Sequence, residues 1–337
     1  MDKRAVVGAG VLVAAALAWA AFGTGAPEEA RPPAAESGPH LFLSGKYGKV
    51  WRVGLDGAVA EQHVRELNPG DPPHHLLARG ETLLGWGYET YLLDPALEKE
   101  ATELVDDSLF VVASAREDRV WVATEDEDPT TKGRIAAVRE ITTGGRVTVG
   151  DVRPPNGAWP AAAVSAGLLM HPHGDLVVWD PRTDDVVYRF PARGDLGPTH
   201  GDLVAWCELG CSELRVTDVT TGRETVIAPP RGFWKFRGWD GAFSPDGATI
   251  AVPVSAKAGG KRVQLALVDV GRASARAVPD TETDELFNFV AWSDTGSHVF
   301  FTGAEGDRRT IFVYDPKTSR VRIVPADVGE FYDAAAI

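Results

Sequence analysis

The chain has 337 residues, 44% of them hydrophobic, and its 36 Gly and 23 Pro are typical of many strands joined by many turns. Its formal net charge is −14, with 34 Lys and Arg against 48 Asp and Glu. Because the phosphates of a nucleic acid would meet net repulsion, this charge argues against nucleic-acid binding.

The N-terminal segment is expected to direct export. Lys3 and Arg4 precede an uncharged run that ends at Phe22, and Ala18-Trp19-Ala20 within it fits the small-x-small pattern of a cleavage site. The run is also just long enough to cross a bilayer as a helix. We therefore predict an apolar helix in residues 1–22, which is either a signal peptide or a signal anchor. The two alternatives share an extracytoplasmic location for the remainder, either membrane-anchored or secreted.

A Pro/Glu/Ala-rich linker is predicted over residues 23–38, and the main domain over 39–337. Within that domain, an apolar strand-like run that ends in an acidic residue and a turn recurs seven times, at intervals of 38 to 51 residues. A period near 40 residues with strand-type content is typical of a β-propeller with one blade per repeat. We therefore predict an all-β fold, a single seven-bladed β-propeller.

The acidic residues of the repeats are interpreted as turn residues. An Asp ahead of a turn accepts hydrogen bonds from backbone amides about two positions later, so hairpin geometry explains each copy without a ligand. The residues are Asp56, Asp94, Glu140, Asp180, Asp218, Asp269 and Asp315.

Five tryptophans recur within the strand-like runs and are predicted to pack between blades, because recurrence at comparable positions indicates a shared core. They are Trp51, Trp121, Trp179, Trp206 and Trp292.

Cys207 and Cys211 are the only cysteines. In an exported protein such a pair is interpreted first as a disulfide, and the residues between them can form a tight turn that brings the two Cβ atoms within bonding range. We predict a structural disulfide that stiffens one hairpin. Free thiols are the alternative, whereas a redox or metal site lacks the further residues that it needs.

An aromatic and basic cluster lies in a predicted connection between units. It consists of Phe233, Trp234, Lys235, Phe236 and Trp239. One interpretation is packing of a long loop over the next blade. The other is a surface that contacts a partner or ligand, because connections at a propeller face are where both are met.

Two units match each other closely, residues 241–252 and 289–300. The first contains the turn Ser244-Pro245-Asp246-Gly247, and the second contains Ser293-Asp294-Thr295-Gly296. A polar first residue and a late glycine suit a tight reversal between antiparallel strands. At these residues the chain resembles the TolB-like and WD-repeat-like β-propellers, exported bacterial type. The Gly-His and Trp-Asp dipeptides of the WD subgroup are not repeated, which favours the TolB-like assignment.

The first unit, 39–73, lacks a leading strand. Residues 329–337 resemble the leading segment of the last unit, 285–292, position by position in character. We predict that 329–337 forms the innermost strand of the first blade and closes the ring. The units between them are predicted at 74–108, 109–154, 155–198, 199–237, 238–284 and 285–328.

No catalytic, cofactor or metal pattern stands out. A Gly-x-Ser-x-Gly elbow is absent, and His171 and His173 flank Pro172 in a segment typical of a turn. The sequence therefore predicts no catalytic residue, cofactor or metal.

The resemblance implies a non-enzymatic module of the cell envelope that binds proteins or acts as a scaffold, with an envelope protein as partner and the membrane as a second contact if the N-terminal segment is retained. The alternative is an enzyme or binding protein for a small molecule or sugar, with its site in the central funnel. Convergent charged groups around a deep pocket would favour the alternative, and exposed aromatics on a flat rim would favour protein binding.

Overall fold

The structure is a computed structural model, and Pro39–Ile337 form one compact unit of it. The described residues are 38–45, 48–64, 75–87, 89–106, 108–125, 135–170, 175–237, 241–256, 262–283, 289–305, 308–326, 328 and 331–337. The predicted N-terminal helix and most of the predicted linker lie outside them, as do His171 and His173. Within these ranges the helical residues are Gly48 and those of the 3-10 turn η2 (Pro155–Gly157), and no helix is long and apolar enough to cross a membrane.

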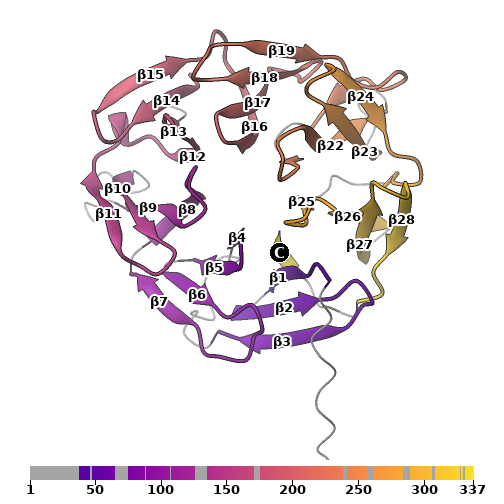
Figure 1. Ribbon diagram of the computed structural model, residues 1–337, viewed down its shortest axis with the longest axis horizontal. Helices are drawn as coiled ribbons and strands as arrows, with labels where there is room; N and C mark the ends of the chain where they lie inside the picture. The colour runs from indigo at the N-terminus through magenta and orange to yellow at the C-terminus, as the bar shows by residue number, and fades with distance from the viewer. Residues whose placement is uncertain are drawn as a thin grey trace, which may run out of the picture. The chain divides into compact units, whose positions relative to one another are not determined.

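Seven antiparallel sheets stand around a central axis, as Figure 1 shows, so the predicted all-β, seven-bladed propeller is confirmed. The innermost strands are β29 (Phe331–Ala336), β4 (His75–Arg79), β8 (Ser108–Ala113), β12 (Pro160–Val164), β16 (Gly194–His200), β21 (Ala242–Phe243) and β25 (Val290–Trp292). The second strands are β1 (Leu41–Gly45), β5 (Thr82–Trp86), β9 (Arg119–Glu125), β13 (Gly167–Met170), β17 (Leu203–Glu208), β22 (Thr249–Ser255) and β26 (Val299–Glu305).

Two further strands complete each sheet toward the outside of the ring. The third strands are β2 (Lys49–Val53), β6 (Thr90–Leu93), β10 (Ile135–Thr142), β14 (Val177–Asp180), β18 (Leu214–Asp218), β23 (Val263–Asp269) and β27 (Arg308–Asp315). The outermost strands are β3 (Val59–His63), β7 (Thr102–Val105), β11 (Val147–Val152), β15 (Asp185–Arg189), β19 (Glu224–Ile227), β24 (Ser274–Ala277) and β28 (Arg320–Ile323). The sixth blade has a fifth strand, β20 (Lys235–Phe236), which pairs with β22.

Burial falls from the second strands to the outermost ones. Every residue of β13 is buried, whereas β15, β24 and β28 contain none that is. Both faces of the second and third strands are covered by neighbouring sheets, so these strands are rich in Val, Leu, Ile and Ala. The outermost strands meet water and carry charged residues. The hydrophobic clusters accordingly lie between adjacent blades.

The five recurring tryptophans pack between blades as predicted. Trp51, Trp121, Trp179 and Trp206 are at most 5% exposed and belong to the inter-blade clusters. Trp292 lies on an innermost strand, β25, and is only partly buried. It packs against the hydrophobic cluster between the sixth and seventh blades and also lines the central axis.

The acidic turn residues behave as predicted in five of the seven copies. The carboxylates of Asp56, Asp94, Asp180, Asp218 and Asp315 each accept a hydrogen bond from the backbone N–H two residues later, at 2.8 to 3.3 Å. Asp269 accepts instead from the N–H three residues later, at 2.8 Å. The seventh copy, Glu140, departs from the pattern, because its carboxylate is buried and bonds side chains rather than its own turn.

The two matched units form the predicted strand, turn and strand. The hydroxyl of Ser244 accepts from the N–H of Thr249 at 2.9 Å, and that of Ser293 accepts from the N–H of His298 at 3.0 Å. Gly247 has φ of 69°, a left-handed conformation that glycine adopts without strain. Each turn therefore joins an innermost strand to a second strand.

The C-terminal strand β29 pairs with a strand from the start of the domain. β29 pairs antiparallel with β1, with Leu41 opposite Ala336 and Leu43 opposite Ala334. Mutual backbone hydrogen bonds of 2.9 and 3.0 Å between His40 and Ile337 extend the ladder. Two predicted unit boundaries were wrong, since β16 begins at Gly194 rather than near residue 199, and β20 belongs to the sixth blade rather than to a connection.

The alternation of strand direction gives the propeller two distinct faces. The turns between first and second strands, and between third and fourth strands, lie on one face, which we call the turn face. The connections between blades and the loops between second and third strands lie on the opposite face, which we call the connection face. The seven acidic residues of the repeats lie at or near the ends of third strands and therefore lie toward the turn face.

Candidate functional site

A central cavity of about 710 Å³ lies on the propeller axis. Its lining includes residues from the innermost strands of all seven blades, together with the turns that follow several of them. Because the turns line it, the cavity extends toward the turn face. Each blade contributes part of the lining, and no single stretch of the sequence contains the whole site.

Small side chains keep the axis open. Six of the seven innermost strands contribute alanine to the lining, and β16 contributes Thr199 and His200 instead. Innermost strands converge toward the axis, so larger side chains at these positions would fill the space between them. The alanines are Ala78, Ala113, Ala163, Ala242, Ala291 and Ala335.

Three charged side chains line the cavity near its turns. Arg79 ends β4, Glu117 lies in the turn after β8, and Asp294 lies in the turn after β25. Burial lowers the pKa of Arg79, against the opposing effect of Glu117 and Asp294. Burial in the cavity wall raises the pKa of Asp294, and the charge of Glu117 raises it further, while Arg79 acts in the opposite direction. Arg79 and Asp294 therefore interact electrostatically with each other, and the charge of Glu117 acts on both.

These charges interact without pairing directly. Among the described residues, no ion pair of 4.0 Å or less joins Arg79 to Glu117 or to Asp294. One Arg79 nitrogen, Nη2, donates a hydrogen bond of 2.6 Å to the carbonyl oxygen of Ser114, and the buried Nε has no partner in the described part of the chain. The site thus holds separated charges facing a cavity, an arrangement typical of ligand sites rather than of a packed core.

Aromatic residues form the wall on the side of the sixth and seventh blades. The indole N–H of Trp292 donates to the carbonyl oxygen of Ala242 at 3.0 Å, which fixes the ring between two innermost strands. The rings of His200 and Phe243 have centroids 6.0 Å apart. His200 also packs against Gly247, where a Cβ would lie 2.5 Å from the imidazole Cδ2. The hydrogen bond of Trp292 and the packing of His200 therefore hold the aromatic wall in place.

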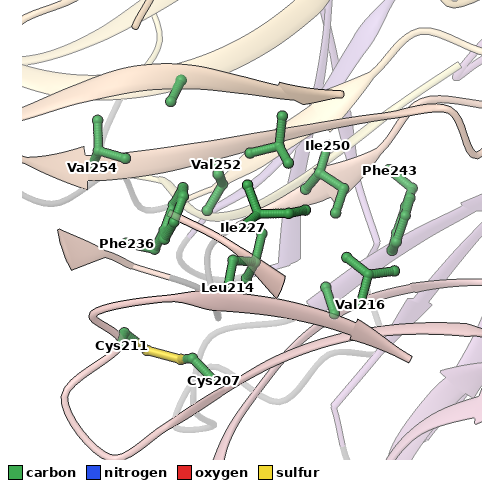
Figure 2. Close-up of a cluster of buried hydrophobic side chains, with 13 residues drawn as sticks. Cys207, Cys211, Leu214, Val216, Ile227, Phe236, Phe243, Ile250, Val252 and Val254 are labelled. Carbon is green, nitrogen blue, oxygen red and sulfur yellow. A yellow bond between two sulfur atoms is a disulfide. The ribbon is translucent and has the colours of Figure 1, made fainter. Parts of the chain in front are cut away.

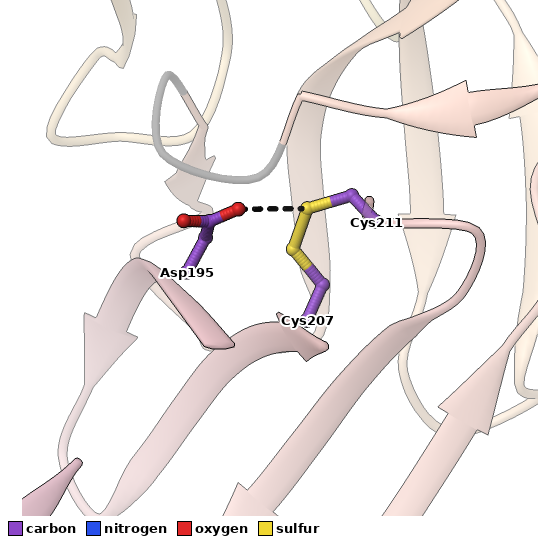
Figure 3. Close-up of a disulfide and its surroundings, with 3 residues drawn as sticks. All are labelled: Asp195, Cys207 and Cys211. Atoms are coloured by element: carbon purple, nitrogen blue, oxygen red, sulfur yellow. Dashed lines mark hydrogen bonds between the residues drawn. A yellow bond between two sulfur atoms is a disulfide. The ribbon is translucent and has the colours of Figure 1, made fainter. Parts of the chain in front are cut away.

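The predicted disulfide between Cys207 and Cys211 is present (Figure 3), with the Cα atoms 5.0 Å apart and both residues at most 2% exposed. A carboxylate oxygen of Asp195 lies 3.8 Å from the sulfur of Cys211. Because a disulfide sulfur carries no proton to donate and is not a thiolate, this contact is neither a true hydrogen bond nor a metal site, although the three side chains are close together.

The disulfide joins two residues of one hairpin, and the turn that it closes also contacts the next blade. The backbone N–H of Phe236 in β20 donates to the carbonyl oxygen of Cys211 at 3.0 Å. Both cysteines belong to a hydrophobic cluster with Phe236 and Val254 of the sixth blade (Figure 2). The disulfide-bonded turn therefore fastens the fifth blade to the sixth on the connection face.

The structure divides the predicted aromatic and basic cluster. Trp234 is 49% exposed, and the ammonium of Lys235 lies 4.9 Å from the centre of its ring. Phe236 is fully buried and Phe233 packs partly buried against the same core, so the prediction that Phe236 contacts a partner was wrong. Trp239 lies outside the described residues. Of the described residues of this cluster, Trp234 and Lys235 remain as candidates for a contact surface.

Sequence reasoning missed the cavity residues. Glu117 and Asp294 were visible only as members of turns, and Arg79 had no motif around it. The signal that existed was the alanine near the end of several innermost strands, but alanine has little specificity when the strands themselves are not yet placed.

No family model and no curated protein matches the chain. Several solved structures share its fold at low sequence identity. Apo AztD from Citrobacter koseri is 14% identical with a TM-score of 0.52, over 89% of this chain and 98% of that one. TolB from Acinetobacter baumannii is 14% identical with a TM-score of 0.51, over 100% and 73%.

The periplasmic gluconolactonase PpgL of Pseudomonas aeruginosa is 16% identical with a TM-score of 0.55, over 89% of this chain and 99% of that one. At such identities the similarity bears on the fold and on nothing finer. It supports a TolB-like seven-bladed β-propeller fold for this chain.

Proposed function

We propose that this protein is an extracytoplasmic, non-enzymatic binding module that holds a small polar molecule in its central cavity. The observation that carries the proposal is the set of unpaired charges, Arg79, Glu117 and Asp294, around a cavity kept open by alanines. Isolated charges near low-dielectric walls are costly unless a ligand or water compensates them. Of the two functions predicted from the sequence, this proposal corresponds to the alternative, in its form as a small-molecule binding protein with its site in the central funnel.

Binding is favoured over catalysis by the partners of the serine hydroxyls at the cavity. The Ser114 hydroxyl donates to Glu140 at 2.8 Å, and the Ser244 hydroxyl donates to Asp246 at 2.6 Å. Both carboxylates have a lowered pKa and are therefore weak bases, so neither is suited to activate its serine as a nucleophile. Among the described lining residues, the geometry supplies recognition groups without an activated nucleophile.

An extracytoplasmic location is supported by three features that do not depend on one another. Residues 1–22 have the pattern of a signal peptide or anchor, with a linker at 23–38 ahead of a propeller at 39–337. The Cys207–Cys211 disulfide suits an oxidising compartment. The similarity to a periplasmic gluconolactonase agrees with both. We include in this proposal that β29 closes the ring.

The proposal is tested by screening the full chain, purified in detergent, against sugars, sugar acids, amino acids, amines and organic acids. Ligand-observed NMR and thermal shift report binding, and recovery of the unchanged compound separates binding from turnover. Narrowing the cavity with Ala113→Leu should abolish binding, whereas Ala58→Leu, at an exposed turn outside the lining, should not. Binding that survives Ala113→Leu in a folded protein, or no binding by any class of compound, overturns the proposal.

A second candidate function is protein binding through the connection face. The observation that favours it is Trp234, which is 49% exposed and stacked by Lys235, since exposed Trp beside a cation is typical of contact surfaces. Membrane extracts passed over the immobilised full chain should yield an envelope protein that the Trp234→Ala variant fails to retain. Equal retention by both proteins would dismiss this surface.

A further inference from the structure

We propose that the ligand of the central cavity is a small organic cation, a protonated or quaternary amine, bound beside Asp294 and Trp292. This inference rests on the proposed function and specifies the chemical class that the cavity takes. It follows from the charges of the described lining, from the aromatic wall and from the spacing of the carboxylates.

The first argument is the sign of the charge. The described lining contains two carboxylates, Glu117 and Asp294, and one guanidinium, Arg79, so the sum is −1 with histidine neutral. The Arg79 guanidinium already donates to the carbonyl oxygen of Ser114. A monovalent cation would neutralise the cavity and relieve the repulsion between the two carboxylates.

The second argument is the separation of Arg79 from the proposed binding place. Arg79 belongs to the second blade and Asp294 to the seventh, and β29 of the first blade lies between them, contributing Ala334, Ala335 and Ala336 to the lining. The repulsion that a cation would meet from Arg79 is therefore weaker than its attraction to Asp294. Glu117, on the third blade, acts from the opposite side.

The third argument is the aromatic wall. Trp292 precedes Asp294 by two residues, and Phe243 lies on the neighbouring innermost strand. An ammonium gains about 0.5 to 2 kcal/mol over the face of an aromatic ring, with Trp the strongest. The combination of a carboxylate, aromatic rings and alanines suits a cation with a hydrocarbon body.

The spacing of the ligands argues against a metal ion. The only described group of three or more potential ligands within 4.8 Å of one another is Asp195 with Cys207 and Cys211, and both of these sulfurs are held in the disulfide. Calcium needs six to eight oxygen ligands. Glu117 and Asp294 belong to no such group among the described residues, so an organic cation fits them better.

The test uses four small probes with the full chain in detergent: n-butylammonium, tetramethylammonium, butyrate and calcium chloride, each measured by titration calorimetry or ligand-observed NMR. We expect the two ammonium ions to bind and butyrate and calcium not to bind. Asp294→Asn should weaken ammonium binding by about tenfold and Glu117→Gln by less, while Arg79→Gln should strengthen it, because removing a like charge favours a cation. Glu98→Gln removes an equal charge from an exposed position outside the lining and should change nothing.

Each contrary result has a defined meaning. Preferential binding of butyrate overturns the proposal of an organic cation but leaves a cavity-binding function intact. Calcium binding by the wild type that is lost in Asp294→Asn has the same meaning. Ammonium binding that is equal in the wild type and in Asp294→Asn also overturns it. If no probe binds and the wider screen of small polar molecules is empty as well, the proposed function fails with it. Melting temperatures of all variants confirm that they are folded.

Discussion

The carboxylate of Asp333 accepts a hydrogen bond of 3.1 Å from the backbone N–H of Leu76. Asp333 belongs to the C-terminal strand β29 of the first blade, and Leu76 to the innermost strand β4 of the second, so one side chain joins two blades whose strands come from opposite ends of the domain. The same carboxylate lies 3.2 Å from Nδ1 of His75. The position of β29 is therefore fixed both by its ladder to β1 and by this contact.

Replacing Asp333 with alanine should destabilise the propeller by about 1 to 3 kcal/mol, because the N–H of Leu76 loses its acceptor where it is partly buried. Urea unfolding followed by tryptophan fluorescence measures the change. Asp151→Ala, which removes a more exposed carboxylate paired with Arg139, is the matched control and should cost less than about 1 kcal/mol. Equal losses in the two variants would show that the contact with Leu76 contributes nothing specific.

Deleting residues 329–337 should abolish the cooperative fold. The deletion removes the buried Phe331 and the ladder between β29 and β1, which leaves one edge of β1 unpaired while the other still pairs with β2. We expect a loss of about 5 kcal/mol or more, comparable to the total stability of many domains. Circular dichroism and thermal melting measure it, and an unchanged melting temperature would mean that β29 does not close the ring.

Glu140 shows why one acidic repeat residue was misread. Its side chain is one methylene longer than Asp, and instead of its own turn it accepts hydrogen bonds from Arg119 at 2.9 Å, Thr148 at 2.8 Å and Ser114 at 2.8 Å. Arg182 of the fourth blade lies 3.5 Å away. Burial alone would raise the pKa of Glu140, but these hydrogen bonds and the charge of Arg182 outweigh it and lower the pKa.

Glu140→Gln should therefore destabilise the protein by about 2 to 4 kcal/mol at neutral pH, since it removes a buried anion from the partly buried Arg119 and from Arg182. Because the folded pKa lies below the unfolded one, the contribution of Glu140 is complete above the unfolded pKa and disappears as the pH falls through the folded pKa. The difference in unfolding free energy between wild type and variant should shrink on acidification. Asp180→Asn, which keeps an acceptor oxygen in its turn, is the control and should show no comparable loss.

The number of blades could be predicted because the turn chemistry repeats. In six of the seven blades an Asp carboxylate accepts a hydrogen bond from a backbone N–H of the turn that follows it. The central cavity could not be predicted, because its charges come from the end of β4 and from the turns after β8 and β25, and they meet only once the ring closes. β20 escaped notice for a different reason. With only Lys235 and Phe236, it is too short to show a strand period, and its existence depends on pairing with β22 and on the carbonyl of Cys211.

Removing the disulfide should cost about 2 kcal/mol by the chain-entropy model, the value for so short a loop. The Cys207→Ala/Cys211→Ala double variant should lose this amount in urea unfolding, together with a small packing loss at the junction of the fifth and sixth blades. Titration with a thiol reagent should find no free sulfhydryl in the native protein and two after reduction under denaturing conditions. Two reactive thiols before reduction would contradict the disulfide.

Neighbouring residues of the segment 233–239 should respond to substitution in opposite ways. Trp234→Ala removes an exposed side chain and Lys235→Ala a partly exposed one, and each should change the free energy of unfolding by less than about 0.5 kcal/mol. Phe236→Ala should cost about 3 to 5 kcal/mol, because its ring is fully buried among Leu214, Ile227 and Val254. Thermal and urea unfolding of the three variants measure the contrast. A large loss for Trp234→Ala would assign that ring to the core and would remove the basis for a contact surface on the connection face.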